Sequence, residues 1–144
     1  MSRLIIRPVS AATFISIAVS LLIAQSAHAS ADPAACEALK SAGAFAKTTV
    51  TSAKVVNADT AKRVPSFCEV TATVKPVQGS NITVVYRLPD NWNGKMLGLG
   101  GGGWAGNILL HPRVPGQMTA APGLEKGYAT AQTKGGHDVD NVWD

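Results

Sequence analysis

This sequence of 144 residues has little cysteine, few aromatic residues and little charge. Two cysteines are too few for a disulfide-dominated miniprotein or a zinc site made of four thiolates. Charged residues form 15% of the chain and hydrophobic residues 46%, so it is too apolar to stay disordered. No fixed period recurs, which excludes solenoid repeats, collagen and coiled coils. The composition predicts one small globular domain.

The first 29 residues differ from the rest of the chain. Two arginines precede an apolar run over residues 11–24, and Ala27-His28-Ala29 has the small-x-small pattern that signal peptidases cleave. A helix of about 14 residues reaches roughly 21 Å, which is less than the roughly 30 Å hydrocarbon core of a bilayer. We therefore predict a signal peptide over residues 1–29, a mature chain over 30–144 without a membrane segment, and a secreted or periplasmic location.

The charge balance argues against a nucleic-acid partner. The chain has 13 Lys and Arg against 9 Asp and Glu, for a formal net charge of +4. Two of the positive charges, on Arg3 and Arg7, belong to the predicted signal peptide. Because no dense stripe of Lys and Arg remains in the mature chain, we expect no binding to nucleic acid.

Export would give the two cysteines, Cys36 and Cys68, a structural role. An even pair of cysteines in an oxidising compartment forms a disulfide by default. In the chain-entropy model, closing this loop stabilises the fold by about 3–4 kcal/mol. His111 and His137 do not lie at a recognised zinc spacing from the thiols, so no metal site is expected.

Hydrophobic patterning predicts a mixed α/β sheet. The expected elements are a helix from Asp32-Pro33 to Gly43, strands over 50–56, 68–75, 82–88 and 95–100, a short helix ending at Gly127, and a strand over 128–133. The segment 95–100 lacks polar alternation, as expected of an interior strand covered on both faces. The architecture expected is an antiparallel hairpin that leads into central strands.

The hairpin is the clearest part of this prediction. Apolar and polar residues alternate along both of its strands, which is typical of half-buried antiparallel strands. The residues expected on its buried face are Cys68, Val70, Ala72, Val74, Ile82, Val84, Tyr86 and Leu88.

Four consecutive glycines, Gly100–Gly103, follow the predicted interior strand. Three interpretations are open: a nucleotide-binding loop, a tight turn that lets Trp104 enter the core, and an oxyanion-hole loop that gives a backbone N–H to an ester carbonyl. The segment that follows has prolines rather than a helix, which disfavours the nucleotide loop. The oxyanion loop best explains four glycines in succession, because glycine leaves the backbone donor unobstructed.

Several segments together resemble the N-terminal part of the tannase and feruloyl esterase family. They are Phe67-Cys68-Glu69-Val70, Val85-Tyr86-Arg87-Leu88-Pro89-Asp90-Asn91-Trp92-Asn93-Gly94-Lys95, Leu99-Gly100-Gly101-Gly102-Gly103-Trp104-Ala105-Gly106, Gly127-Tyr128-Ala129 and Gly136-His137. The resemblance covers most of the mature chain. The Leu-Pro-x-x-Trp-Asn-Gly-Lys segment combined with the glycine run makes it fairly specific.

The resemblance implies a secreted α/β-hydrolase that cleaves small aromatic acid esters through a Ser-Asp-His triad. In this family the serine lies in a Gly-Cys-Ser-x-Gly-Gly turn, and a large lid often holds calcium. This sequence contains no Gly-x-Ser-x-Gly and no lid, so residues 30–144 are expected to be the incomplete front part of the hydrolase domain, ending before the nucleophile elbow and inactive alone. We expect no cofactor in this chain.

The residues predicted to carry function are few. Gly102 and Gly103 are expected to supply the backbone oxyanion donors, and Trp104 to shape the substrate site. The alternative hypothesis is a small secreted β-rich module whose Trp92 and Trp104 stack on carbohydrate or phenolic ligands.

Overall fold

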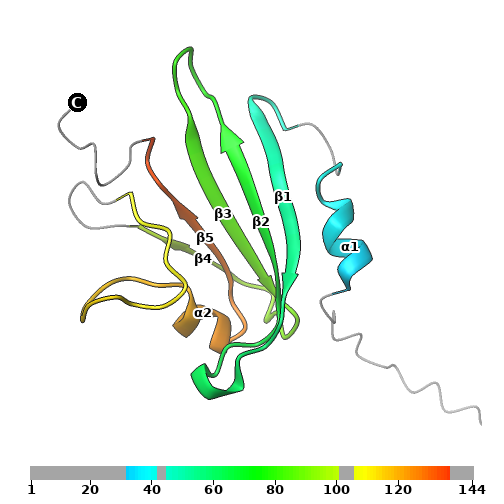
Figure 1. Ribbon diagram of the computed structural model, residues 1–144, viewed down its shortest axis with the longest axis vertical. Helices are drawn as coiled ribbons and strands as arrows, with labels where there is room; N and C mark the ends of the chain where they lie inside the picture. The colour runs from blue at the N-terminus through cyan, green and yellow to red at the C-terminus, as the bar shows by residue number, and fades with distance from the viewer. Residues whose placement is uncertain (1–31, 42–44, 101–105, 137–144) are drawn as a thin grey trace, which may run out of the picture.

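The computed structural model describes residues 32–41, 45–100 and 106–136 (Figure 1). Its elements are α1 (Pro33–Ala38), β1 (Thr48–Val56), the 3₁₀ turn η1 (Thr60–Lys62), β2 (Phe67–Val74), β3 (Ile82–Pro89), β4 (Met96–Leu99), α2 (Ala121–Glu125) and β5 (Ala129–Thr133). The strands form one sheet in the order β1-β2-β3-β5-β4. All neighbours are antiparallel except β4 and β5, which are parallel. The predicted mixed sheet with its antiparallel hairpin is confirmed. The strand predicted over 95–100 as interior and covered on both faces is instead the last strand of the sheet formed by the described residues, and its Met96 is 61% exposed.

The start of α1 follows the sequence prediction closely. The carboxylate of Asp32 accepts a hydrogen bond from the Ala34 N–H at 2.9 Å, and Pro33 is the first helical residue. The helix ends at Ala38, before the predicted end at Gly43. Its last turn tightens, because the Leu39 N–H donates to the carbonyl of Cys36 at 3.1 Å.

The sheet has two faces, each partly covered by one helix. On the face we call the α1 face, Cys36 of α1 packs with Ala53, Cys68 and Val70 of β1 and β2. On the opposite face, the α2 face, Phe67 packs with Ala121 and Leu124 of α2. Because side chains alternate along a strand, every strand contributes residues to both faces.

The structure corrects the buried face predicted for β3. Tyr86 and Leu88 lie on the α1 face and are 36% and 41% exposed, whereas Val85 and Arg87, on the α2 face, are buried. The reason is the position of the two helices in the tertiary structure. Helix α1 packs against β1 and β2. On the opposite face, α2 packs against β5, and its core cluster includes Phe67 of β2 and Leu99 of β4.

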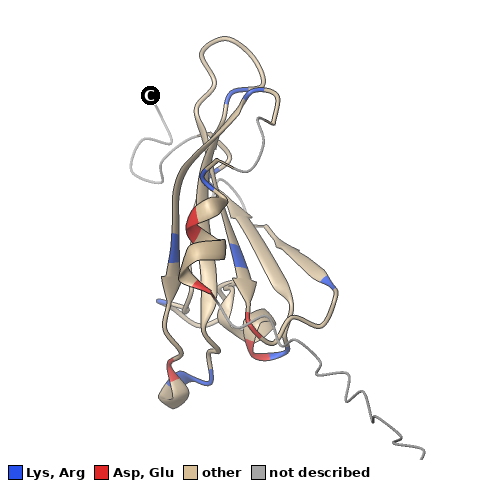
Figure 2. Ribbon diagram, turned by 90° about the vertical axis from the view of Figure 1, so that its right-hand side faces the viewer, with Lys and Arg blue, Asp and Glu red and all other residues tan. Residues whose placement is uncertain are grey.

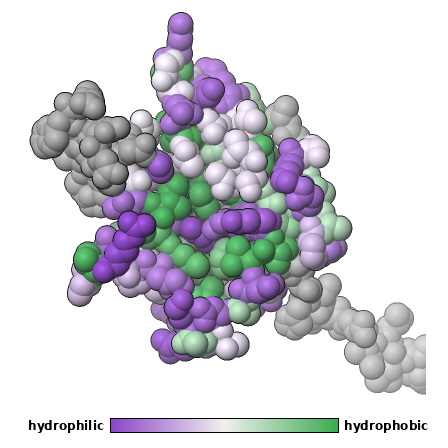
Figure 3. Space-filling model, viewed as in Figure 1, coloured by the Kyte–Doolittle hydropathy of each residue, from purple (hydrophilic) through white to green (hydrophobic). Residues whose placement is uncertain are grey.

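The described residues carry charges of both signs. Acidic and basic residues are scattered over several elements (Figure 2). Hydrophobic and hydrophilic side chains lie side by side on the face shown in Figure 3. Among the described residues, no helix is long and apolar enough to cross a membrane.

Candidate functional site

The candidate site begins where β4 ends. Leu99 is the last residue of β4, and Gly100 is the first glycine of the run. The predicted donors Gly102 and Gly103 and the predicted substrate residue Trp104 lie outside the described residues. Their roles therefore remain predictions, and the structure defines the strand that leads into them.

The end of β4 lies at an edge of the sheet that is suited to binding. Because β4 and β5 are parallel, their carboxyl ends meet at the same edge, and Leu99 is in register with Gln132. Ligands of open α/β sheets bind outside the carboxyl ends of parallel strands. A side chain added at Gly98 or Gly100 would meet no atom within 4 Å, so the backbone there is open to approach.

A buried polar network supports β5 next to this strand. The Arg87 guanidinium donates to the carboxylate of Glu69 at 3.0 Å and to the side-chain carbonyl of Gln132 at 2.8 Å. Arg87 is 4% exposed and Gln132 3%, so these bonds tie β2, β3 and β5 together within the covered face. Burial lowers the pKa of Arg87, and the charge of Glu69 partly opposes this effect.

Sequence analysis missed this network. Arg87 occupies a polar position in the hairpin, and polar positions were expected to face solvent. The register of β2, β3 and β5 places the side chains of Glu69, Arg87 and Gln132 on one face of the sheet. Nothing in the sequence alone fixed which face would be covered.

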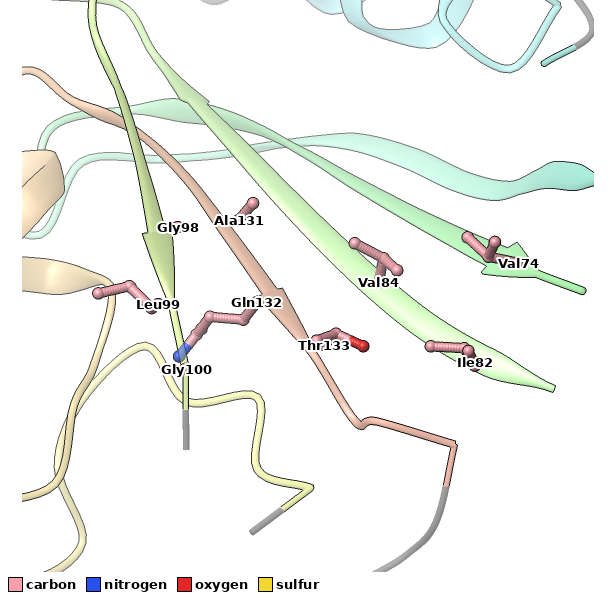
Figure 4. A pocket seen from close by; sticks show the side chains of 9 residues that line it. All are labelled: Val74, Ile82, Val84, Gly98, Leu99, Gly100, Ala131, Gln132 and Thr133. Atoms are coloured by element: carbon pink, nitrogen blue, oxygen red, sulfur yellow. The ribbon is translucent and has the colours of Figure 1, made fainter. Parts of the chain in front are cut away.

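A shallow hollow of about 420 Å³ lies beside the end of β4 (Figure 4). It is lined by Val74, Ile82, Val84, Gly98, Leu99, Gly100, Ala131, Gln132 and Thr133. Val74, Ile82 and Val84 stand on β2 and β3 at one side of the hollow, with β5 in the middle and β4 at the other side. Its lining is almost wholly apolar, so it suits a hydrophobic occupant.

The turn before β4 is held by the end of α2. The Asn93 N–H donates to the carbonyl of Gly127 at 2.8 Å, and its side-chain amide donates to the carbonyl of Lys126 at 2.7 Å. Gly127 has φ +77°, and a Cβ there would lie 2.6 Å from the carbonyl oxygen of Asn91. The segments Trp92–Lys95 and Gly127–Ala129 thus pack closely against one another. They fix where the parallel strands β4 and β5 begin.

Trp92, in the same turn, has a clear local role. Its indole N–H donates to the carbonyl of Lys95 at 2.9 Å, while 59% of the residue is exposed. The hydrogen bond helps to close the turn, so the polar end of Trp92 is not free for a ligand.

The sequence of this chain can be compared with models of known protein families. The family model described as tannase and feruloyl esterase matches residues 68–143, more than half of the chain. The chain belongs to the tannase and feruloyl esterase family. The match begins at Cys68 in β2 and includes the hairpin, the Trp92 turn, β4 and β5.

Individual relatives of the family agree with this assignment. An uncharacterised esterase of Agrobacterium fabrum is 33% identical over 90 residues, which are 60% of this chain and 16% of the relative. A probable feruloyl esterase of Arthroderma benhamiae is 36% identical over 78 residues, 51% of this chain and 13% of the relative. This chain therefore spans only a small part of the length of these curated relatives.

A solved structure of the same family has the same fold. The crystal structure of feruloyl esterase B from Aspergillus oryzae matches 76% of this chain and 22% of its own, with a TM-score of 0.59 and 27% identity. The predicted α/β-hydrolase fold is confirmed, and the sheet described above is part of that fold.

The two cysteines of this tannase-family chain form the expected disulfide. Cys36 and Cys68 are both buried, and their Cα atoms are 5.7 Å apart. The bond joins α1 to the first residues of the family match. Among the residues described, no group of three or more His, Cys, Asp or Glu side chains could hold a metal ion.

Proposed function

We propose that this chain supplies the oxyanion part of a secreted carboxylic ester hydrolase that acts on esters of aromatic acids. The observation that carries the proposal is the position of the glycine run, directly after a parallel strand at the carboxyl edge of an α/β-hydrolase sheet. Family membership and the names of the relatives, which are esterases, support it.

The chemistry requires backbone donors at this position. When a serine Oγ attacks the ester carbonyl and a histidine takes its proton, the carbonyl oxygen gains a negative charge. N–H groups of Gly102 and Gly103 would donate to this oxygen and stabilise the tetrahedral intermediate. The intermediate then collapses while the histidine returns its proton to the departing alcohol. The same histidine takes a proton from a water molecule, which attacks the acyl-serine and releases the aromatic acid and the free serine. Trp104, next to the donors, would line the pocket for the acyl group.

Residues 30–144 contain no nucleophile elbow, the motif whose serine would create this charge. They contain no Gly-x-Ser-x-Gly, and a donor alone has no oxyanion to stabilise. We therefore expect residues 30–144 to hydrolyse no ester without a nucleophile from elsewhere. Calcium, where it is bound in the family lid, would lie outside the residues present here. The Cys36–Cys68 disulfide supports an oxidising compartment and hence export.

A chimaera tests the oxyanion role. The matching segment of feruloyl esterase B from Aspergillus oryzae is replaced by this chain, and hydrolysis of methyl ferulate is measured. We expect a folded, active chimaera in which Gly102→Pro or Gly103→Pro, each of which removes one N–H donor, lowers kcat about 10²–10³-fold. A folded chimaera in which neither substitution lowers kcat would overturn the proposal.

The control lies far from the site. Gly79→Ala changes a glycine with φ +85° in the loop between β2 and β3, where a Cβ meets no atom within 4 Å. It strains the backbone of that loop but removes no proposed donor, so kcat should stay within about twofold of the parent chimaera. The unfused residues 30–144, assayed in parallel on methyl ferulate and methyl gallate, should show no turnover above buffer.

A further inference from the structure

Two exposed turns meet at one end of the sheet. Residues 45–47 precede β1, and residues 75–81 join β2 to β3 (Figure 1). The Lys75 N–H donates to the carbonyl of Lys47 at 2.8 Å, which holds the two turns side by side. We call these two segments the tip. The tip lies at the end of the sheet where β5 ends, because β3 starts there and runs antiparallel to β5.

The tip exposes two apolar side chains. Phe45 is 67% exposed and Val77 is 69% exposed, one in each turn. Turns of this kind usually carry polar residues, glycine or proline. A single exposed apolar residue is common, but two on adjacent turns indicate a surface that binds something. These side chains fit a partner with an apolar phase.

The tip is also positively charged. Lys47 and Lys75 are exposed, and neither segment of the tip contains Asp or Glu. Within the described residues these two lysines form no ion pair, whereas Lys40, Lys54 and Lys62 each have an acidic partner. The described part of the chain thus leaves the charge of the tip unneutralised, and this charge complements an anionic partner.

Hydrogen bonds within the tip satisfy polar groups around Val77. The Ser80 hydroxyl accepts from the Val77 N–H at 3.1 Å and donates to the Val77 carbonyl at 2.6 Å. The Lys47 ammonium donates to the carbonyl of Pro76 at 2.6 Å, a neutral acceptor that leaves its charge in place. Polar backbone groups that lose contact with water need such partners. The loop around Val77 can therefore enter a medium less polar than water.

We propose that the tip binds the surface of a lipid bilayer that contains anionic lipids. Phe45 and Val77 enter the interfacial region, while Lys47 and Lys75 bind the phosphate groups of the lipids. An anionic polysaccharide would meet the two charges but offers no apolar phase for Val77, so a bilayer accounts for both features of the tip. The protein lies on the bilayer and does not cross it.

This orientation places the bilayer near the candidate site. Because β4 and β5 are parallel, β4 also ends at the end of the sheet that carries the tip. Binding through the tip turns the carboxyl ends of both strands toward the lipid surface. The inference needs none of the catalytic roles proposed above.

Vesicle binding tests the proposal. The mature chain, residues 30–144, and its chimaera with feruloyl esterase B are mixed with vesicles of phosphatidylcholine alone or of phosphatidylcholine with phosphatidylglycerol. Sedimentation measures the partition coefficient. At low salt we expect it to be about tenfold higher on the anionic vesicles, and high salt should remove this difference. Hydrogen exchange should slow in the tip and not in α2.

Two lysine variants test the role of charge. Lys47→Gln combined with Lys75→Gln should lower the partition coefficient on anionic vesicles about tenfold. The matched control is Lys95→Gln combined with Lys126→Gln, which removes the same charge next to the starts of β4 and β5, at the other end of the sheet. It should change the partition coefficient less than about twofold, because those charges lie far from the lipid.

Two further variants test the apolar contact. Phe45→Ser combined with Val77→Ser should lower the partition coefficient about tenfold and leave its salt dependence in place. The matched control is Val114→Ser combined with Met118→Ser, at residues that are 56% and 58% exposed in the segment before α2. That control should bind as the parent does.

The outcomes that would overturn the proposal are distinct. They are equal partition onto the two kinds of vesicle, equal losses in the tip and control variants, and retention on immobilised polygalacturonate without binding to vesicles. All variants change exposed side chains and should keep the far-UV circular dichroism of the parent. Because ester hydrolysis is not measured, the result is independent of the proposed function.

Discussion

The two faces of the sheet differ in how they are completed. On the α2 face, Phe67 and Leu124 are completely buried, and Arg87 is buried with two polar partners. On the α1 face, α1 packs against β1 and β2 and is joined to β2 by one disulfide, while Tyr86 and Leu88 of β3 are 36% and 41% exposed. The comparison teaches that the same alternating strand can bury its polar side chains on one face and expose apolar side chains on the other. Four sets of variants test this difference.

The largest expected effect is the loss of the aromatic ring at the centre of the covered face. Phe67→Ala removes a fully buried side chain that packs with Ala121 and Leu124, and should lower the free energy of unfolding by about 3–5 kcal/mol. Leu88→Ala, on the open face, should cost less than about 1 kcal/mol. Urea titration followed by circular dichroism measures both. Equal losses would show that the two faces contribute alike.

Removal of the disulfide should affect the α1 face next most strongly. Cys36→Ala combined with Cys68→Ala frees α1 from β2 and should lower the free energy of unfolding by about 3–4 kcal/mol in the chain-entropy model. Hydrogen exchange should rise in α1 and β1 before it rises near α2. Dithiothreitol should destabilise the parent chain but not the double variant. If α1 kept its protection in the variant, packing alone would hold the helix.

The buried ion pair tests the polar part of the covered face. Arg87→Met leaves Glu69 and Gln132 without their shared donor, and should cost about 1–3 kcal/mol by urea titration. The matched control is Lys54→Met, which removes the outer partner of Glu69, 3.6 Å away and 64% exposed at its side chain. That change should cost less than about 1 kcal/mol, because surface pairs are screened. A stabilised Arg87→Met chain would instead indicate that burying the charge outweighs its bonds.

The smallest expected effect is a gain in stability. Thr130 is 1% exposed, and its hydroxyl is the one buried side-chain oxygen or nitrogen of the described residues without a hydrogen-bond partner. Thr130→Val has the same shape without the unpaired hydroxyl, so it should raise the free energy of unfolding by about 1 kcal/mol. Thr133→Val, at an exposed position of the same strand where the hydroxyl accepts a hydrogen bond from the Gly135 N–H at 3.1 Å, should not raise it. A loss of stability in Thr130→Val would show that the hydroxyl has a partner such as bound water.

Much of the fold could be predicted from local pattern. The cap at Asp32 and Pro33, the hairpin between β2 and β3, and the short helix ending near Gly127 each depend on residues close in sequence. The prediction that the first helix extends to Gly43 was wrong. Helix α1 ends at Ala38, because its last turn tightens after Cys36. The pairing of β4 with β5 could be expected only as part of a mixed sheet, because no local pattern specifies a parallel register.

Only part of the candidate site could be predicted from the sequence. The glycine run was evident from the sequence, since four consecutive residues without a side chain indicate a backbone that a ligand can approach closely. The hydrogen bonds from Asn93 to Gly127 and Lys126 were not evident, because they join segments 33 and 34 residues apart through backbone carbonyls. The Arg87 network was missed because its side chains come from three strands and the sequence does not show which face of the sheet is covered.

The sequence by itself determined which residues alternate, where the chain turns, and that it carries the motifs of the tannase and feruloyl esterase family. Only the tertiary structure decided which face of β3 is covered, because alternation divides side chains into two sets but contains no information on where a distant helix will pack. The set with Arg87 faces the side of the sheet where α2 packs and is buried, whereas Tyr86 and Leu88 of the other set stay exposed. That difference depends on packing between segments far apart in the sequence.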